Sequence, residues 1–154
     1  MDKTLNQIKK DLNEIGTKHK QISSFFFGGF LDAISRDAVD YPLMNCTIQP
    51  GSFGDNFVSF NIMVTICDKY NESNYEQIDE VHSDMLSILR DIYITFKQER
   101  FEEYLSISGD PATDPFLNKG HDVTAGWSMN LNLEVYDSND WCSIPSDGFD
   151  YGND

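Results

Sequence analysis

Residues 56–68 alternate between apolar and mixed positions over a stretch long enough to restrict the fold strongly. Successive side chains of a β-strand point to opposite sides, so every second residue here shares a face. A long strand with one apolar side is typical of an antiparallel sheet whose apolar face is covered by other elements. The apolar face comprises Val58, Phe60, Ile62, Val64 and Ile66. The opposite, mixed face comprises Phe57, Ser59, Asn61, Met63, Thr65 and Cys67.

A second stretch, near the end of the chain, shows the same alternation. We expect it to form a strand that pairs with residues 56–67, because each strand offers one apolar face. Residues 44–48 and 104–107 are two shorter strand candidates. The sequence therefore predicts a small, mainly antiparallel sheet of about four strands. The apolar positions of the second stretch are Trp127, Met129, Leu131, Leu133 and Val135.

Residues 75–99 carry apolar side chains at the spacing of an amphipathic helix. Asn74 is a candidate N-cap, with Gln77 three residues further on. The helix would be roughly 37 Å long, enough to cross a whole sheet. Together with the strands, it predicts an α+β fold with helices packed on one face of the sheet. The apolar stripe consists of Ile78, Val81, Met85, Ile88, Leu89, Ile92, Tyr93 and Phe96.

Residues 2–20 also have helical spacing, but their apolar stripe is narrow, and Gly16 weakens the end of the helix. Residues 1–21 hold five lysines and three acidic residues, a charge of +2 in a chain of net charge −15. The stripe is too thin for a central core helix, so it packs either on its own domain or on a neighbouring molecule. We treat residues 1–21 as an N-terminal helical arm and a candidate assembly element. Its stripe consists of Leu5, Ile8, Leu12 and Ile15.

The length and composition are those of one domain with a substantial core. The chain has 154 residues, close to the commonest domain size, and 40% of them are hydrophobic. We expect the core domain to span residues 22–137. Residues 138–154 contain several aspartates and neither lysine nor arginine, so we expect an acidic C-terminal segment there.

Charge and cysteine content limit the possible functions. A net charge of −15 repels phosphate backbones, so strong nucleic-acid binding is not expected. The three cysteines are an odd number without paired spacing, which predicts free thiols in a reducing compartment. The polar N-terminus lacks the apolar region of a signal peptide, and no apolar run is long enough to span a membrane, so no membrane partner is expected.

The sequence contains no arrangement that indicates catalysis. A His-Ser-Asp run occupies residues 82–84, but neighbours on a helix point in different directions, whereas the groups of a catalytic triad converge. Asp110, Asp114, His121 and Asp122 are candidate ligands for a hard cation, yet their spacing does not match a calcium-binding loop. Phosphate-binding glycine motifs and zinc-ligand spacings do not occur either. We therefore expect no enzyme, no metal site and no cofactor.

The densest apolar cluster is aromatic and lies within residues 22–43. Core filling and a subunit interface are both open interpretations of it, because aromatic residues are common in both. Residues 108–124, rich in Pro, Gly and Asp, predict a long exposed loop. The cluster comprises Phe25, Phe26, Phe27, Phe30 and Leu31. Candidate interface residues from the arm, the cluster and the loop are Leu5, Ile8, Leu12, Ile15, Phe25, Phe26 and Phe116.

Several short motifs follow one another in an order shared with a known family. They are Tyr41-Pro42 before a strand, Cys67-Asp68-Lys69 at the end of the long strand, Glu80-Val81-His82-Ser83-Asp84-Met85 and Arg90-Asp91-Ile92 in the helix, Gly126-Trp127 opening the late strand, and Cys142-Ser143-Ile144-Pro145. In this order they resemble the tail-terminator-like neck proteins of tailed bacteriophages, especially those of crAss-like phages of gut bacteria. The resemblance covers residues 25–146 and leaves out the arm and the acidic C-terminal segment.

The resemblance implies a structural virion protein in the head-to-tail connector, or neck. It implies a closed homo-oligomeric ring of six or twelve copies, with the portal and other neck or tail proteins as partners. Double-stranded DNA would pass through the lumen without specific binding, which agrees with the acidic charge. Assembly would take place in the cytoplasm of the host bacterium, and the resemblance implies no catalytic residues.

Two other functions remain open at this point. An acidic inhibitor that mimics DNA and blocks a nuclease would also carry a strongly negative charge, but as a monomer or dimer. A metal-dependent enzyme would reveal itself by the metal content of the purified protein. Size-exclusion chromatography with light scattering separates a ring protein from a DNA mimic.

Overall fold

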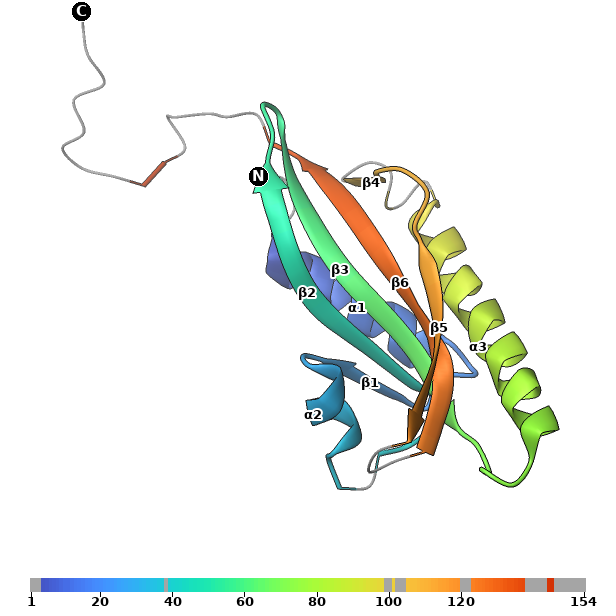
Figure 1. Ribbon diagram of the computed structural model, residues 1–154. Coiled ribbons are helices and arrows are strands. Elements are labelled where there is room, and N and C mark those ends of the chain that lie inside the picture. Colours follow the sequence, from blue (N-terminus) through green and yellow to red (C-terminus); the bar gives the residue numbers. More distant parts are fainter. Residues whose placement is uncertain are drawn as a thin grey trace, which may run out of the picture.

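Figure 1 shows a computed structural model of the protein, which describes residues 4–37, 39–98, 101, 105–119, 123–137 and 144–145. The fold is α+β, as the sequence predicts. In chain order, the elements are α1 (Leu5–Lys18), β1 (Ser24–Phe27), α2 (Phe30–Ile34), β2 (Leu43–Phe53), β3 (Phe57–Lys69), α3 (Tyr75–Phe96), β4 (Leu105–Ile107), β5 (Thr113–Lys119) and β6 (Val123–Tyr136).

The strands of the described residues form one mixed, six-stranded sheet. The strand order is β1-β2-β3-β6-β4, and β5 also pairs with β6. β1 is parallel to β2, whereas all other pairs are antiparallel. β4 pairs with residues 133–135 and β5 with residues 123–129, so two short strands share one edge of β6. The four strands expected from the sequence are present, and β1 and β5 are additional.

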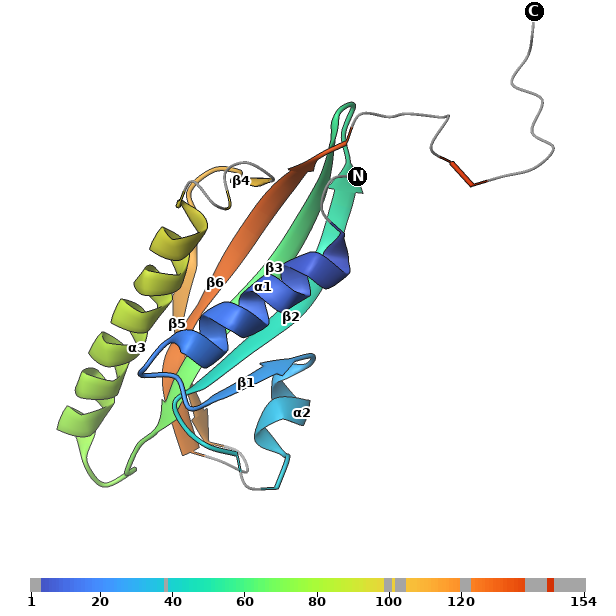
Figure 2. The ribbon, with the colours of Figure 1, turned by 180° about the vertical axis from the view of Figure 1, so that it is seen from behind.

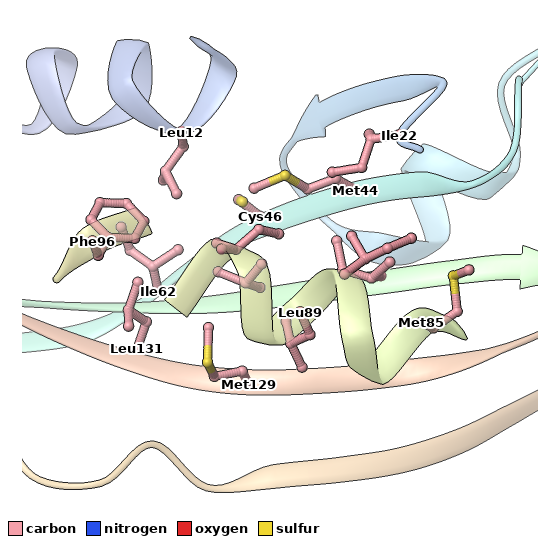
Figure 3. Packing of buried hydrophobic residues seen from close by; sticks show 14 of the residues in the cluster. Leu12, Ile22, Met44, Cys46, Ile62, Met85, Leu89, Phe96, Met129 and Leu131 are labelled. Carbon is pink, nitrogen blue, oxygen red and sulfur yellow. The ribbon is translucent and has the colours of Figure 1, made fainter. Parts of the chain in front are cut away.

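β3 and β6 form the centre of the sheet and pair in a register that joins their apolar faces. Ile62 lies opposite Leu131 and Val64 opposite Met129, and none of the four side chains is more than 2% exposed. The expected pairing of the two long strands is therefore confirmed. Helices α1 and α3 both cover this face (Figure 2), and their side chains meet those of β2, β3 and β6 in the main core (Figure 3).

Helix α3 begins and packs as its sequence predicts. Oδ1 of Asn74 accepts a hydrogen bond from the backbone N–H of Gln77 at 3.3 Å, which caps the helix. The apolar stripe faces the sheet, and this burial stabilises the helix more than its intrinsic propensity does. The buried residues of the stripe are Val81, Met85, Ile88, Leu89, Ile92 and Phe96.

Helix α1 packs on its own domain. A capping box starts it: Oγ1 of Thr4 accepts from the backbone N–H of Gln7, and the Gln7 side chain accepts from the backbone N–H of Thr4. Ile8 and Leu12 have no exposed surface and belong to the main core. Of the two interpretations of the narrow stripe, packing within the same chain is therefore the one that the structure contains.

Gly16 explains how a helix with so narrow a stripe comes to be buried. A Cβ at this position would lie 2.9 Å from Cδ2 of Phe25 and 3.0 Å from Sδ of Met44. The glycine therefore lets the α1 backbone approach β1 and β2 closely. The expectation that Gly16 only weakens the end of the helix missed this contact, because it depends on residues distant in the sequence.

Helix α2 corrects the expectation that all helices lie on one face of the sheet. Its Ala33 and Ile34 pack against Leu43 and Cys67, which face away from the main core. A second, smaller core therefore lies under one end of the opposite face. The segment before α2 forms β1 from the residues SFFF, whose composition has no alternation that could mark a strand.

The expectation of a loop over residues 108–124 is also wrong in part, because β5 lies inside it. The side chains of β5 are mostly exposed, so no apolar pattern identifies the strand from the sequence. Pro115 belongs to it, which is compatible with a strand at a sheet edge. Residues 120–122, the rest of the expected loop up to Val123, lie outside the described residues.

The hairpin of β2 and β3 extends past the helices at one end of the molecule (Figures 1 and 2). The acidic C-terminal segment, residues 138–154, lies outside the described residues except for residues 144 and 145. Within the described part of the chain, no helix is both long enough and apolar enough to cross a membrane.

Candidate protein-interaction face

The face of β2, β3 and β6 that points away from the main core is partly open: Asn130 is exposed and most of its neighbours are partly exposed, whereas Asn45, Ser59 and Thr65 are buried. Helix α2 covers only the end of it at Leu43 and Cys67. Pairing places Met63 between Thr47 and Asn130, and the neighbouring rows follow the same register. We call this surface the open face and define it by Asn45, Thr47, Gln49, Ser59, Asn61, Met63, Thr65, Ser128, Asn130 and Asn132.

Hydrogen bonds hold several side chains of the open face in place. Oγ of Ser59 donates to Oδ1 of Asn132 at 2.6 Å, joining β3 to β6. Nδ2 of Asn61 donates to the backbone carbonyl of Pro50 at 2.7 Å, and Oγ1 of Thr47 donates to the carbonyl of Gly28 at 2.7 Å. A surface ordered in advance loses less side-chain entropy when a partner covers it.

The ten residues that define the open face are uncharged, although the chain has a net charge of −15. Between residues 41 and 67 the only charged residue is Asp55, and residues 123–133 contain none. Two carboxylates lie on the same side of the sheet at the margins of the face, because Asp114 pairs with Ser128 and Glu134 pairs with Ser59. An acidic protein repels another acidic protein over most of its surface, and the open face is where that repulsion is weakest.

The tip of the β2–β3 hairpin adds an exposed apolar group. Phe53, at the end of β2, is 89% exposed, and Ile48 on the same strand is 46% exposed. β1 pairs only with residues 43–46, so among the described strands none covers the outer edge of β2 beyond Cys46. Pro50 and a register shift between Gln49 and Ser52 interrupt this edge, which disfavours the addition of another strand.

A cleft lies between α3 and the start of β5. Its volume is about 360 Å³, within the size range of binding pockets. Leu86, Leu89 and Met129 form apolar walls, and Arg90 and Asp110 add one charge of each sign. The remaining lining residues are Tyr93, Pro111 and Thr113. We call it the α3–β5 cleft.

The candidate interface residues of α1 and β1 lie at the main core. Ile8 and Leu12 are fully buried there, and Leu5 and Ile15 are partly exposed on the same helix. Phe25 is partly buried and packs beside Gly16. These side chains hold α1 to the sheet, so a second molecule could reach only the partly exposed ones.

Phe26 and Phe116 are brought together in the second core, under α2. The rings of Phe30 and Phe116 meet edge to face with centroids 5.5 Å apart, and the guanidinium of Arg36 lies 4.2 Å from the centre of the Phe26 ring. Six of the seven candidate interface residues therefore divide between two cores rather than forming one surface, and Leu5 is partly exposed on α1. Sequence reasoning missed the open face, although its freedom from charge is visible in residues 41–67.

The His-Ser-Asp run of residues 82–84 lies on α3 and does not converge. Nε2 of His82 is 3.0 Å from the carbonyl oxygen of Phe116, so this nitrogen carries the hydrogen and donates. Nε1 of Trp127 donates to the carbonyl of His82 at 2.9 Å. Ser83 and Asp84 are exposed. His82 therefore joins α3 to β5 and β6, a structural role.

The expected cation candidates are only partly within the described residues. Asp110 and Asp114 are exposed, whereas His121 and Asp122 lie outside the described residues. Among the residues that the structure describes, no three His, Cys, Asp or Glu side chains are grouped as metal ligands would be.

Comparisons with known proteins do not identify the chain. No protein-family model matches it, and no curated protein sequence matches it significantly.

Proposed function

We propose that the protein is a structural subunit that assembles with further copies into a ring in the neck of a tailed bacteriophage, without catalysing a reaction. The open face carries this proposal. It is a broad surface of ordered, uncharged side chains, with a carboxylate at each of two margins, on a chain of net charge −15. Such a surface lets acidic neighbours pack together with little repulsion between like charges.

The physical reason is the cost of bringing like charges together. A ring brings many identical acidic subunits into contact. At each contact the two surfaces that meet must not repel each other. On this chain the open face and the hairpin tip meet that condition. The acidic remainder would then line the lumen or face solvent, and it would not hold the phosphates of passing DNA.

The packing of the family-like motifs supports the proposal. Cys67 pairs with Gly126 across β3 and β6, and Nε1 of Trp127 donates to the carbonyl of His82. The ammonium group of Lys69 lies 5.1 Å from the centre of the Tyr41 ring. Four of the motifs, far apart in the sequence, thus meet at one end of the sheet.

The experiment is to measure the mass of the purified protein over a range of concentrations, by light scattering and native mass spectrometry. Negative-stain electron microscopy of the same samples shows whether higher oligomers are closed rings. We expect oligomers of more than two copies. A protein that stays monomeric at the highest concentration and forms no complex with a phage portal would contradict the proposal, and a monomer that inhibits a nuclease would favour the DNA-mimic function.

A charge placed on the open face tests whether this face is used. Asn130 is exposed at the centre of the face, so Asn130→Asp adds a negative charge without removing a buried contact. We expect weaker assembly and an unchanged melting temperature. Asn6→Asp is the matched control, because Asn6 is exposed on α1, away from this face. Equal assembly of the two variants would show that the open face is not an interface.

A further inference from the structure

We propose that Phe53 of one copy inserts into the α3–β5 cleft of the next copy. This inference rests on the proposed function, because it names the two surfaces by which copies of the chain join. It concerns a second copy of the chain and no other partner. The hairpin tip and the cleft are different surfaces of one molecule, so the contact is heterologous, the type that generates rings.

The hairpin tip is ordered and presents an aromatic side chain. The backbone N–H of Gly54 donates to the carbonyl of Phe57 at 2.8 Å, and a Cβ at Gly54 would overlap the Phe57 ring. The backbone N–H of Asp137 donates to the carbonyl of Asn56 at 2.8 Å, which holds the tip to the end of β6. An exposed aromatic ring on such a rigid turn loses little conformational entropy on binding.

The α3–β5 cleft has the size and chemistry to receive that ring. An apolar cavity of about 150 Å³ is enough to hold benzene, and the cleft has about 360 Å³. Leu86, on its rim, is 38% exposed, while Leu89 and Met129 are almost fully buried at its walls. A buried aromatic side chain in an apolar pocket is the usual kind of residue that dominates an interface.

The charges of the two surfaces are compatible. Asp55, two residues from Phe53, is the single charge of the hairpin tip, residues 53–57. Arg90 lines the cleft and, among the described residues, makes no ion pair. Asp110 offsets it, so the cleft has no net charge and does not repel the tip.

The tip cannot reach the cleft of its own molecule. Phe53 pairs with Val58, which pairs with Val135, whereas the cleft lies beside Met129. Six residues along β6 separate these levels, roughly 20 Å at the rise of an antiparallel strand. Because β3 and β6 pair without interruption from Phe57 to Lys69, the tip cannot bend back over this distance. Phe53 can therefore enter this cleft only in a second copy.

Removal of the aromatic side chain of Phe53 is the first test. Phe53→Ala should weaken self-association by roughly thirtyfold, the effect of losing a central aromatic anchor, without a change in melting temperature. Tyr75→Ala is the matched control, because Tyr75 is an aromatic residue that is 80% exposed at the start of α3, eleven residues before Leu86 of the cleft. Light scattering over a dilution series measures both variants beside the parent. If Phe53→Ala assembles as well as Tyr75→Ala, the inference is wrong.

Cross-linking distinguishes this contact from a tip-to-tip contact. In a Cys142→Ser background, Ser52→Cys, which keeps the Phe53 ring, is mixed with a second protein that carries Thr113→Cys in the cleft, and both are oxidised mildly. We expect disulfide-linked dimers in the mixture and none with Ser52→Cys alone. Dimers of Ser52→Cys alone would overturn the inference and indicate a symmetrical contact instead.

The outcomes separate this inference from the proposed function. If the parent protein and Phe53→Ala assemble equally well, the ring proposal stands and Phe53 is not part of the interface. If the parent protein never assembles, both the ring proposal and this inference are wrong. Cross-linking between positions 52 and 113 together with closed rings in micrographs supports both.

Discussion

Nε2 of His19 lies 2.9 Å from Oδ2 of Asp91, so the residue that ends α1 is bonded to α3. The backbone N–H of Gln21 donates to Nδ1 of the same ring at 3.2 Å, so Nδ1 accepts and carries no hydrogen. The imidazole is therefore the Nε2–H tautomer, which donates to Asp91. With Ile8 and Leu12 buried against the sheet, α1 is held by two neighbours at once.

This arrangement makes α1 necessary for stability. Leu12→Asp places a carboxylate where no surface is exposed, so the free energy of unfolding should fall by about 4 kcal/mol or more. Urea unfolding followed by circular dichroism measures the change. The control is Asn13→Asp on the exposed side of the same helix, which should change the free energy by less than about 0.5 kcal/mol. Equal unfolding midpoints for Leu12→Asp and the parent would mean that α1 is detachable.

Truncation of Leu133 tests the main core. The side chain has no exposed surface and lies on β6 opposite Phe60. Leu133→Ala should lower the free energy of unfolding by about 2–5 kcal/mol, because it removes buried methyl groups and leaves a cavity. Leu117→Ala, at a position 47% exposed, is the comparison and should cost far less. A loss below about 0.5 kcal/mol for Leu133→Ala would show that this face of the sheet is not buried.

Asp68 should make stability depend on pH. Burial raises the pKa of its carboxyl group, the charge of Asp84 raises it further, and the hydrogen bond from the Lys69 backbone N–H opposes both. A raised folded-state pKa means that ionisation costs stability as pH rises above the unfolded value of about 3.9. Asp68→Asn removes this cost and keeps an oxygen to accept from Lys69.

We therefore expect Asp68→Asn to be more stable than the parent at pH 7 and equally stable near pH 3. Denaturant midpoints measured across this range test the expectation. Asp79→Asn, on the exposed surface of α3, serves as the control for the loss of one negative charge. Parallel pH profiles for the parent and Asp68→Asn would contradict it.

The thiols of Cys46 and Cys67 should be protected in the folded protein. Both side chains are fully buried, and burial raises the pKa of the Cys46 thiol, which keeps it protonated and unreactive. In a Cys142→Ser variant, a thiol reagent such as Ellman's reagent should label neither residue within minutes. In denaturant it should label both. Rapid labelling of the native variant would show that one of these strands opens readily.

Periodicity identified the central elements because each of their residues faces either the core or the other side. Val64 and Leu131 could be assigned to the buried face from their neighbours alone, and Asn74 marked the start of α3 by its side-chain chemistry. β1 and β5 have no such pattern. β1 is a run of aromatic residues after one serine, and β5 is an edge strand whose side chains are mostly exposed, so neither alternates between buried apolar and exposed polar positions.

The candidate site depended on pairing across the chain. Thr47, Met63 and Asn130 are far apart in the sequence and become one uncharged surface only because β2, β3 and β6 align them. The narrow stripe of α1 likewise indicated a helix but not its partner, since Gly16 meets Phe25 and Met44 only in the folded chain. By itself, the sequence determined the α+β class, the two long strands and the long helix, because local periodicity depends on which side of an element is buried. The tertiary structure alone decided which surfaces stay open, because exposure depends on contacts between residues distant in the chain.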